Sequence, residues 1–283
     1  KISEYSYACK KLGIKILPPD INYGEGAFSV DHGNIRYGLT AIKSLGRPVI
    51  EAIIRERNLN GPYRDFKDLV ERLSSKEINK RTVENLIKSG ALDCFHVTRK
   101  QQMIVYASVI DSIQKERKNE IAGQMSLMDL LGEEEQQSFQ ISYPDVGEYE
   151  KEQKLAMEKE VLGIYVSGHP LEDDIERLER SVTAHTSDFV IDEETGKTKI
   201  HDRESCIIGG LISEMSVKLT KKNQNMAFIT LEDLRGTVEV VVFPRQYATY
   251  QSLLREDAKV FIKGTTQISE EESKVICNQI ISF

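Results

Sequence analysis

The fold of the last part of the chain is decided by two neighbouring runs, Met226-Ala227-Phe228-Ile229-Thr230-Leu231 and Thr237-Val238-Glu239-Val240-Val241-Val242-Phe243, which flank the turn signal Leu234-Arg235-Gly236. Both runs are rich in β-branched and aromatic residues, which are typical of strands. Three more runs of this kind are expected to form strands: Ile207 to Leu219, Lys259 to Ile268 and Lys274 to Ile281.

The order of these elements indicates a barrel. A helical segment, Arg245 to Leu254, lies between the third and the fourth expected strand. Three strands, a helix and two strands is the order of an OB barrel, whose open face and loops bind oligonucleotides. Gly209-Gly210 lies in the first strand and supplies the bend that lets this strand serve both sides of a small barrel. We therefore expect an OB-fold domain at residues 205–283.

Basic and aromatic residues mark where this domain would meet single-stranded nucleic acid. The lysines of the first loop either bind phosphate or keep a sheet edge soluble. Phe228 either stacks on a base or belongs to the core, and the core is the interpretation we favour. Because the charges of this part balance, affinity is expected to be weak and to fall quickly with salt. The candidates for single-stranded DNA are Lys218, Lys221, Lys222, Phe228, Arg245 and Tyr247.

Charge is unevenly distributed along the 283 residues. The net charge is -7, but the first part of the chain is basic, the middle is acidic and the end is balanced. Separate modules with different partners are typical of such a division. An overall acidic chain does not bind DNA through bulk charge, so any contact with DNA must be local. We expect four parts, at residues 1–95, 96–132, 133–204 and 205–283.

Several classes of protein do not fit the composition. No apolar run is long enough to cross a bilayer and no secretory leader is recognised, so we expect a cytoplasmic protein that does not bind membranes. The chain starts at Lys1 in what looks like running sequence, and we expect a fragment of a larger protein. The four cysteines are far apart and the five histidines show no ligand spacing. Free thiols, no metal site and no cofactor are therefore expected on this chain.

The first part contains an arrangement that is similar to a helix-hairpin-helix motif. Within residues 39–54, apolar residues recur at helical spacing on both sides of the break Leu45-Gly46-Arg47-Pro48. Gly46 is expected to take the positive φ of a tight turn between helices, and Pro48 suits the first turn of the second helix. In such motifs, backbone N–H groups at the start of the second helix bind a DNA phosphate without reading sequence.

The chain departs from this motif at two positions, and alternatives stay open. Arg47 replaces the usual apolar residue, and Pro48 replaces the second glycine and removes one N–H donor. Two packed helices joined by a tight turn are the alternative. Lys80 and Arg81 stand at the start of another expected helix, where cations oppose the helix dipole; they either bind phosphate or are simply solvated. The candidates for duplex DNA are Lys43, Gly46, Arg47, Lys80 and Arg81.

A short amphipathic peptide lies in polar surroundings in mid-chain: Gln124-Met125-Ser126-Leu127-Met128. Apolar residues in such surroundings cannot serve a local core, and they make sense if another protein supplies the pocket. The alternative is a loop helix that packs on its own domain. Residues 133–147 are acidic and rich in glutamine, and we expect them to form a mobile tether that lets the peptide reach its partner.

The order of these features resembles one family. Between the peptide and the barrel stands Glu158-Lys159-Glu160-Val161-Leu162-Gly163-Ile164-Tyr165-Val166-Ser167-Gly168-His169-Pro170-Leu171. Together with Gly38-Leu39-Thr40-Ala41-Ile42-Lys43, Leu86-Ile87-Lys88-Ser89-Gly90-Ala91-Leu92-Asp93 and Phe228-Ile229-Thr230-Leu231-Glu232-Asp233, it resembles the C-terminal half of the alpha subunit of bacterial DNA polymerase III. The peptide at residues 124–128 resembles the sliding-clamp-binding motif of bacterial replication proteins.

The resemblance implies a role in DNA replication for each part. Residues 1–95 would form the helix-hairpin-helix region at the end of the fingers and grip duplex DNA. Residues 96–132 would carry a helix and the clamp-binding peptide, 133–204 an acidic linker and helices, and 205–283 would hold single-stranded template. The partners implied are DNA, the sliding clamp and other replisome proteins. Met128 stands where phenylalanine is common, so weaker but retained clamp binding is expected.

Catalysis is not expected from this chain alone. In the family, the DNA-directed DNA polymerase reaction, a nucleotidyl transfer, depends on palm carboxylates that hold two Mg²⁺ ions and lie earlier in the full protein. Nothing in this sequence matches that set. Two other functions stay open: an independent OB-type RNA- or tRNA-binding module, and a scaffold that contacts only proteins.

Overall fold

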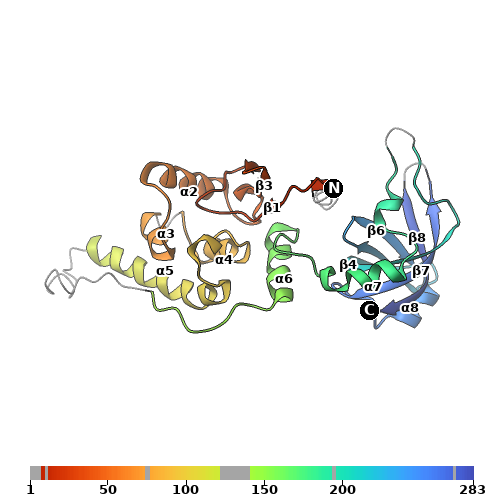
Figure 1. Cartoon of the computed structure of the whole chain (residues 1–283). Coiled ribbons are helices and arrows are strands. Elements are labelled where there is room, and N and C mark those ends of the chain that lie inside the picture. Colours follow the sequence, from red (N-terminus) through yellow and green to blue (C-terminus); the bar gives the residue numbers. More distant parts are fainter. Residues whose placement is uncertain (1–7, 10–11, 74–76, 122–140, 193–195, 270–271) are drawn as a thin grey trace. The chain divides into compact units, whose positions relative to one another are not determined.

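The computed structural model describes residues 8–9, 12–73, 77–121, 141–192, 196–269 and 272–283. The chain divides into two compact units, one of residues Gly13–Gly168 and one that contains His169–Phe283. The four-part division expected from the sequence stays a prediction. The first unit is mainly helical and the second contains a β-barrel (Figure 1).

The first unit begins with a small three-stranded sheet. Its strand order is β1-β3-β2, with β1 parallel and β2 antiparallel to β3, so that β2 and β3 form a hairpin. The elements of the unit are β1 Ile16–Leu17, β2 Ser29–Asp31, β3 Asn34–Arg36, η1 Leu39–Ala41, α2 Arg47–Asn60, α3 Phe66–Arg72, α4 Lys80–Lys88, η2 Asp93–Phe95, α5 Arg99–Ile121 and α6 Lys151–Leu162.

Side-chain caps fix where two of the helices begin. The Asp65 carboxylate accepts a hydrogen bond from the Asp68 amide at 2.8 Å and starts α3. The Asn79 side chain accepts from the Thr82 amide at 3.0 Å and starts α4. Each cap satisfies an amide that has no partner within its helix, which typically stabilises a helix by about 1 kcal/mol.

The hairpin before α2 differs from the sequence prediction in two ways. The segment expected to be the first helix is only the 3₁₀ turn η1, and Gly46 has φ -73°, not a positive φ. The left-handed residue of the turn is Ser44, with φ +63°. Gly46 instead adopts the extended conformation of a residue that precedes a helix, because α2 starts at Arg47 directly after it.

Residues 141–147 are not a tether. Ile141 and Tyr143 pack against the helical core, and the Gln101 side chain donates to the Pro144 carbonyl at 2.8 Å. Burial raises the pKa of Tyr143 to about 12. The prediction is therefore wrong for this part, because its two apolar side chains find a place in the core. Residues 133–140 lie outside the described residues.

A buried ion pair joins the long helix α5 to α6. Arg99 is 1% exposed and Glu158 is fully buried, and the guanidinium donates to the Glu158 carboxylate at 3.0 Å and also to Asp93. The second carboxylate oxygen of Glu158 accepts from the amides of Val166 and Ser167 at 2.8 and 2.9 Å. A charge buried in this way is stable only when all its hydrogen bonds are made.

The second unit is built on a closed barrel with the strand order β4-β5-β6-β8-β7. The expected order of three strands, a helix and two strands is confirmed, and the expected boundaries agree within a few residues. The elements of this unit are η4 Glu172–Asp174, α7 Ile175–Ser181, η5 Thr186–Phe189, β4 Ser205–Leu219, β5 Asn225–Glu232, β6 Thr237–Val242, α8 Pro244–Tyr250, β7 Lys259–Ile268 and β8 Ser273–Ser282.

The first strand of the barrel, β4, pairs with two different strands, as expected. It pairs with β7 through residues 205–211 and with β5 from Leu211 onward, so the change of partner follows directly after Gly209-Gly210. A Cβ atom on Gly210 would clash with the Glu232 carbonyl of the neighbouring strand. Only glycine permits this close approach of two backbones.

The cysteines carry no nucleophilic chemistry in the barrel. All four cysteines of the chain are free, and Cys206 and Cys277 are buried. Burial raises the pKa of the Cys206 thiol to about 11 and that of Cys277 to about 12. Both thiols therefore stay protonated at neutral pH, whereas the thiolate is the reactive form.

One buried carboxylate fastens the segment that precedes the barrel. Asp233, 4% exposed, lies in the turn between β5 and β6 and accepts from the amides of Arg235 and Gly236 at 2.7 and 3.1 Å. It also accepts from the Thr186 amide at 3.0 Å and from the Thr186 hydroxyl. The side chain of Asp233 thus joins the β5–β6 turn to the η5 segment.

We predict that Asp233→Ala lowers the free energy of unfolding of the barrel unit by about 3 kcal/mol, because buried donors lose their acceptor. Pulse proteolysis of the full chain in urea measures the change. Glu179→Ala is the control, since Glu179 also touches this cluster, through Arg235 at 2.7 Å, but is 44% exposed. Its effect should stay below about 1 kcal/mol. Equal effects of the two substitutions would contradict the role given to Asp233.

Candidate nucleic-acid interface

A cavity of about 530 Å³ opens beside the start of α4 in the helical unit. Three of the cations expected to bind duplex DNA lie on its wall, namely Lys43, Lys80 and Arg81, although the sequence separates them by nearly 40 residues. Its lining also includes residues that were not among the expected DNA-binding residues: Ser44, Glu84, Asn85, Lys88, Glu160 and Val161.

Hydrogen bonds hold the walls of this cavity together. The Lys43 amide donates to the Val161 carbonyl of α6 at 2.8 Å, and the Asn85 side chain of α4 donates to the Lys43 carbonyl at 3.0 Å. The Arg81 guanidinium donates to the Ser44 hydroxyl at 3.3 Å. The hairpin at residues 43–44 is therefore fixed from two helices. The role of Asn85 could have been predicted from the sequence, because it is a polar residue on the apolar face of α4. The contact of the Val161 carbonyl of α6 with the Lys43 amide could not.

Carboxylates neutralise some of these cations. Lys80 pairs with Asp111 of α5 at 2.7 Å, and Lys88 pairs with Glu84 at 2.9 Å and with Glu160 at 3.0 Å. Burial lowers the pKa of Lys88, but its bonds to Glu84 and Glu160 outweigh this effect and raise it, so Lys88 stays charged and compensated.

Lys43 and Arg81 are the cations of the cavity that the described residues leave without a carboxylate partner. Both side chains are exposed. Each of these two groups can pair with one phosphodiester, which carries one negative charge. An overall acidic chain can bind DNA only where positive charge is concentrated, and Lys43 and Arg81 provide such a place.

Gly46 and Arg47 lie at the start of α2 and do not line the cavity. Both are exposed. The amides of Val49 and Ile50 already point to the Gly46 carbonyl, and Pro48 has no N–H. No hydrogen bond within the described residues engages the amides of Gly46 and Arg47. Two N–H donors and the Arg47 side chain are thus what α2 can offer to a phosphate.

The second group of expected residues gathers at one end of the barrel. Lys221 and Lys222 lie in the turn between β4 and β5, and Lys218 lies near the end of β4. All three are exposed. The turn is closed by hydrogen bonds of Thr220 with Asn223 and Gln224, and Asn223 takes a positive φ of 56°. The strands therefore present these cations together on a defined hairpin.

Phe228 is not part of the core, contrary to the interpretation we favoured from the sequence. Its neighbours Ala227 and Ile229 fill the barrel interior, so the strand alternation turns Phe228 to the outer face. The ring is half-buried, and the Lys218 ammonium lies 4.8 Å from its centroid. A base can stack on this partly exposed ring when the Lys218 ammonium leaves the ring face for a phosphate.

Arg245 and Tyr247 are not brought to this group by any recorded contact. Tyr247 packs against the barrel core from α8, while Arg245 is exposed in the first turn of the same helix. Among the described residues, no hydrogen bond or ring contact joins either of them to Phe228 or to the lysines of the hairpin. Their role in binding stays a prediction, as does that of Gln124, Met125, Ser126, Leu127 and Met128, which lie outside the described residues.

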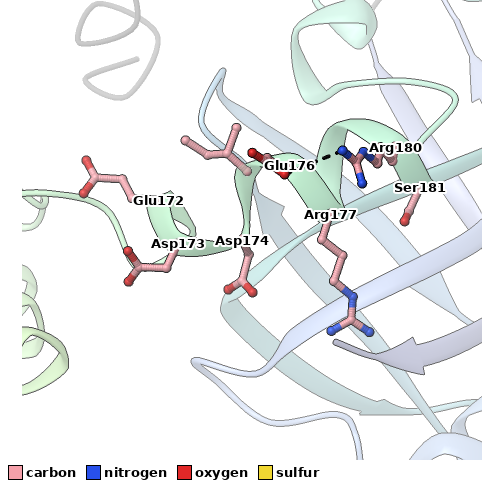
Figure 2. A pocket seen from close by; sticks show the side chains of 8 residues that line it. Glu172, Asp173, Asp174, Glu176, Arg177, Arg180 and Ser181 are labelled. Carbon is pink, nitrogen blue, oxygen red and sulfur yellow. Dashed lines mark ion pairs between the residues drawn. The ribbon is translucent and has the colours of Figure 1, made fainter.

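Figure 2 shows another hollow, beside α7, that is lined from Glu172 to Ser181. Its charged groups are already engaged. Asp174 bonds Lys259 at 2.8 Å, Glu176 pairs with Arg180 at 3.6 Å, and Arg177 lies over the ring of Phe261. We therefore interpret this hollow as a result of the packing of α7 on the barrel and not as a binding site. In the described part of the chain there is no group of His, Cys, Asp or Glu that could hold a metal ion.

The described helices contain none with both the length and the apolar character needed to cross a bilayer.

Comparison with known proteins gives the family context of both units. A model described as a helix-hairpin-helix motif matches residues 13–102, and one described as an OB-fold nucleic acid binding domain matches residues 207–282. The DNA polymerase III subunit alpha of Mycobacterium leprae is 32% identical over 99% of this chain. Those of Escherichia coli K12 and Bacillus subtilis are each 34% identical, over 93% and 99% of this chain.

The chain matches a segment of bacterial DNA polymerase III subunit alpha. It covers 23%, 22% and 24% of these three relatives, so it spans about a quarter of their length. Among solved structures, a mitochondrial single-stranded DNA binding protein from S. cerevisiae covers 29% of this chain and 96% of its own length, at 14% identity and a TM-score of 0.25. At that score the match carries no argument.

We predict that Lys43→Ala with Arg81→Ala weakens duplex DNA binding about tenfold at low salt and reduces the slope of log K against log salt by about 2, since each lost phosphate contact removes roughly one unit. Fluorescence anisotropy with a short duplex measures both. The matched control removes two exposed cations elsewhere in the same unit, by Arg55→Ala with Arg64→Ala. Equal loss in the two variants would show that only net charge matters.

Proposed function

We propose that this chain is a non-catalytic part of a replicative DNA polymerase that binds duplex DNA, single-stranded template and the sliding clamp. One observation carries the proposal: the match to polymerase III alpha subunits runs along nearly the whole chain and includes both a helix-hairpin-helix region and an OB barrel. An independent RNA-binding barrel or a protein-only scaffold would leave one of these two units without a purpose.

The helical unit would hold duplex DNA without reading its sequence. Lys43 and Arg81 support this role, because they stand together on a cavity wall without compensating carboxylates. The amides of Gly46 and Arg47 add donors at the start of α2. Contacts of this kind recognise phosphate and fix the position of the protein on the helix.

The barrel would hold single-stranded template. The lysine-bearing hairpin and the ring of Phe228 support this role, since cations follow the backbone while aromatic faces stack bases. With few cations available, binding would be weak by itself and sensitive to salt.

Weak contacts suffice if the clamp keeps the polymerase on DNA. Residues 124–128 are proposed to bind the clamp because they resemble its recognition motif. A polymerase that is linked to DNA through the clamp experiences a high effective concentration of DNA. Several weak contacts then combine into a long residence on the template. Catalysis with Mg²⁺ would come from another region of the parent polymerase.

Binding measurements on the full chain also test the two alternative functions, an RNA-binding module and a protein scaffold. Binding of the full chain to a single-stranded DNA, to tRNA and to the clamp separates the three alternatives. The proposal expects single-stranded DNA and clamp to bind. Preference for tRNA would favour an RNA-binding module, and clamp binding without any DNA binding would favour a protein scaffold.

We predict that Lys221→Glu with Lys222→Glu weakens binding of a single-stranded oligonucleotide at least fivefold at low salt, since two phosphate contacts become repulsive. Arg180→Glu with Arg255→Glu changes the charge of the same unit equally at exposed positions outside the hairpin. This control should lose much less affinity. An unchanged titration of the hairpin variant would remove the hairpin from the interface.

We predict that replacing Gln124, Leu127 and Met128 with alanine abolishes clamp association and leaves the melting temperature within about 1 °C, because the proposal gives these side chains a pocket on the clamp and no part in a local core. A pull-down on the clamp and a thermal melt measure the two effects. Ile104→Ala, at a 55% exposed position of α5, serves as the apolar control and should retain clamp binding. A large fall in melting temperature would show instead that the peptide packs on its own chain.

A further inference from the structure

The outer face of the barrel carries a gradient of charge along its strands. Ala227, Ile229 and Val240 point into the core, so the residues that alternate with them point outward. Cross-strand partners share a face, and the registers of β4, β5 and β6 therefore define three outward rows: Glu214–Thr230–Glu239, Ser216–Phe228–Val241 and Lys218–Met226. Val241 is only 4% exposed, so the Phe228 row is open toward β4 and covered toward β6.

The row of Phe228 is thus flanked by a cation on one side and by carboxylates on the other. Lys218 lies over the ring at 4.8 Å. Glu214 and Glu239 are exposed, and the described residues offer neither of them a recorded hydrogen bond or ion pair. Lys274 is the cross-strand neighbour of Glu239 on β8. Its bond to Glu272 at 2.9 Å and, to a lesser extent, the charge of Glu239 raise the pKa of Lys274, so Glu239 faces this cation as well as solvent.

We propose that Glu214 and Glu239 make the barrel selective among unpaired bases, favouring those that carry an exocyclic amino group over thymine. The inference rests on the proposed single-strand function and adds a base preference to it. A base stacked on Phe228 would direct its edge toward the carboxylate row, while its phosphodiester follows Lys218 and the lysine hairpin.

The spacing of the rows suits this arrangement. Successive outward rows along a strand lie about 7 Å apart, and strands lie about 4.8 Å apart, so the two carboxylates are roughly 10 Å from each other across β5. A carboxylate one row away from a stacked ring is therefore within reach of the edge of a base, given a hydrogen bond of about 2.9 Å.

The hydrogen-bonding groups on the edge of each base decide which base the carboxylates favour. Carboxylates are acceptors only, and the amino groups of cytosine and adenine are donors. Thymine presents a single ring N–H between two carbonyl oxygens, and these oxygens repel a carboxylate. The same repulsion acts on phosphates, so the carboxylate row also keeps the backbone on the Lys218 side.

The test compares oligo-dC with oligo-dT of equal length, titrated against the full chain at neutral pH and one fixed low ionic strength. Both are pyrimidine strands, and they differ in the edge that meets the carboxylates. We expect oligo-dC to bind at least fivefold more tightly, a discrimination near the lower end for a good base contact. Glu214→Ala with Glu239→Ala should abolish this ratio, mainly by tightening the binding of oligo-dT.

A matched charge control separates selectivity from general electrostatics. Glu256→Ala removes an exposed carboxylate outside the three rows, and it should shift both affinities together and keep the ratio. Equal binding of the two strands by the unaltered chain, or an unchanged ratio in the double variant, would overturn the inference but not the proposed function. Failure to bind either strand would overturn both.

Discussion

A carboxylate with no solvent exposure, Glu158, organises the helical unit. One of its oxygens meets Arg99, which is itself buried, and the other receives the amides of Val166 and Ser167. Removing one partner of such a pair typically costs 3–5 kcal/mol, because the remaining charge cannot reach water. The left-handed residue Gly90 makes room for the guanidinium, since a Cβ there would clash with it.

The candidate DNA-binding cavity depends on this pair through α6. The C-terminal turn of α6 accepts the Lys43 amide on Val161 at 2.8 Å and the Tyr37 hydroxyl on Leu162 at 2.9 Å. A displaced α6 would release the hairpin that carries Lys43 and separate it from Arg81. Asp233 plays a comparable part in the barrel unit. In both units a buried carboxylate that accepts backbone amides holds a loop.

Local pattern predicted much of this molecule. Strand alternation and turn signals located the barrel, and Gly209-Gly210 marked the change of partner in β4. The same alternation, applied to β5 residue by residue, places Phe228 outside, which the sequence interpretation missed by treating an aromatic as core. Partners from distant segments were not predictable. Asp111 neutralises Lys80 from another helix, and residues 141–147 find their place only in the folded core.

The dependence of the cavity on the buried pair is tested most directly by amide hydrogen exchange of Glu158→Gln against the unaltered chain. We expect faster exchange of the Val166 and Ser167 amides and, with them, of the Lys43 amide, whose acceptor is on α6. Protection in β4 to β8 should not change, because the barrel belongs to the other unit. Undiminished protection of Lys43 in a variant that has lost protection at Val166 would contradict the account.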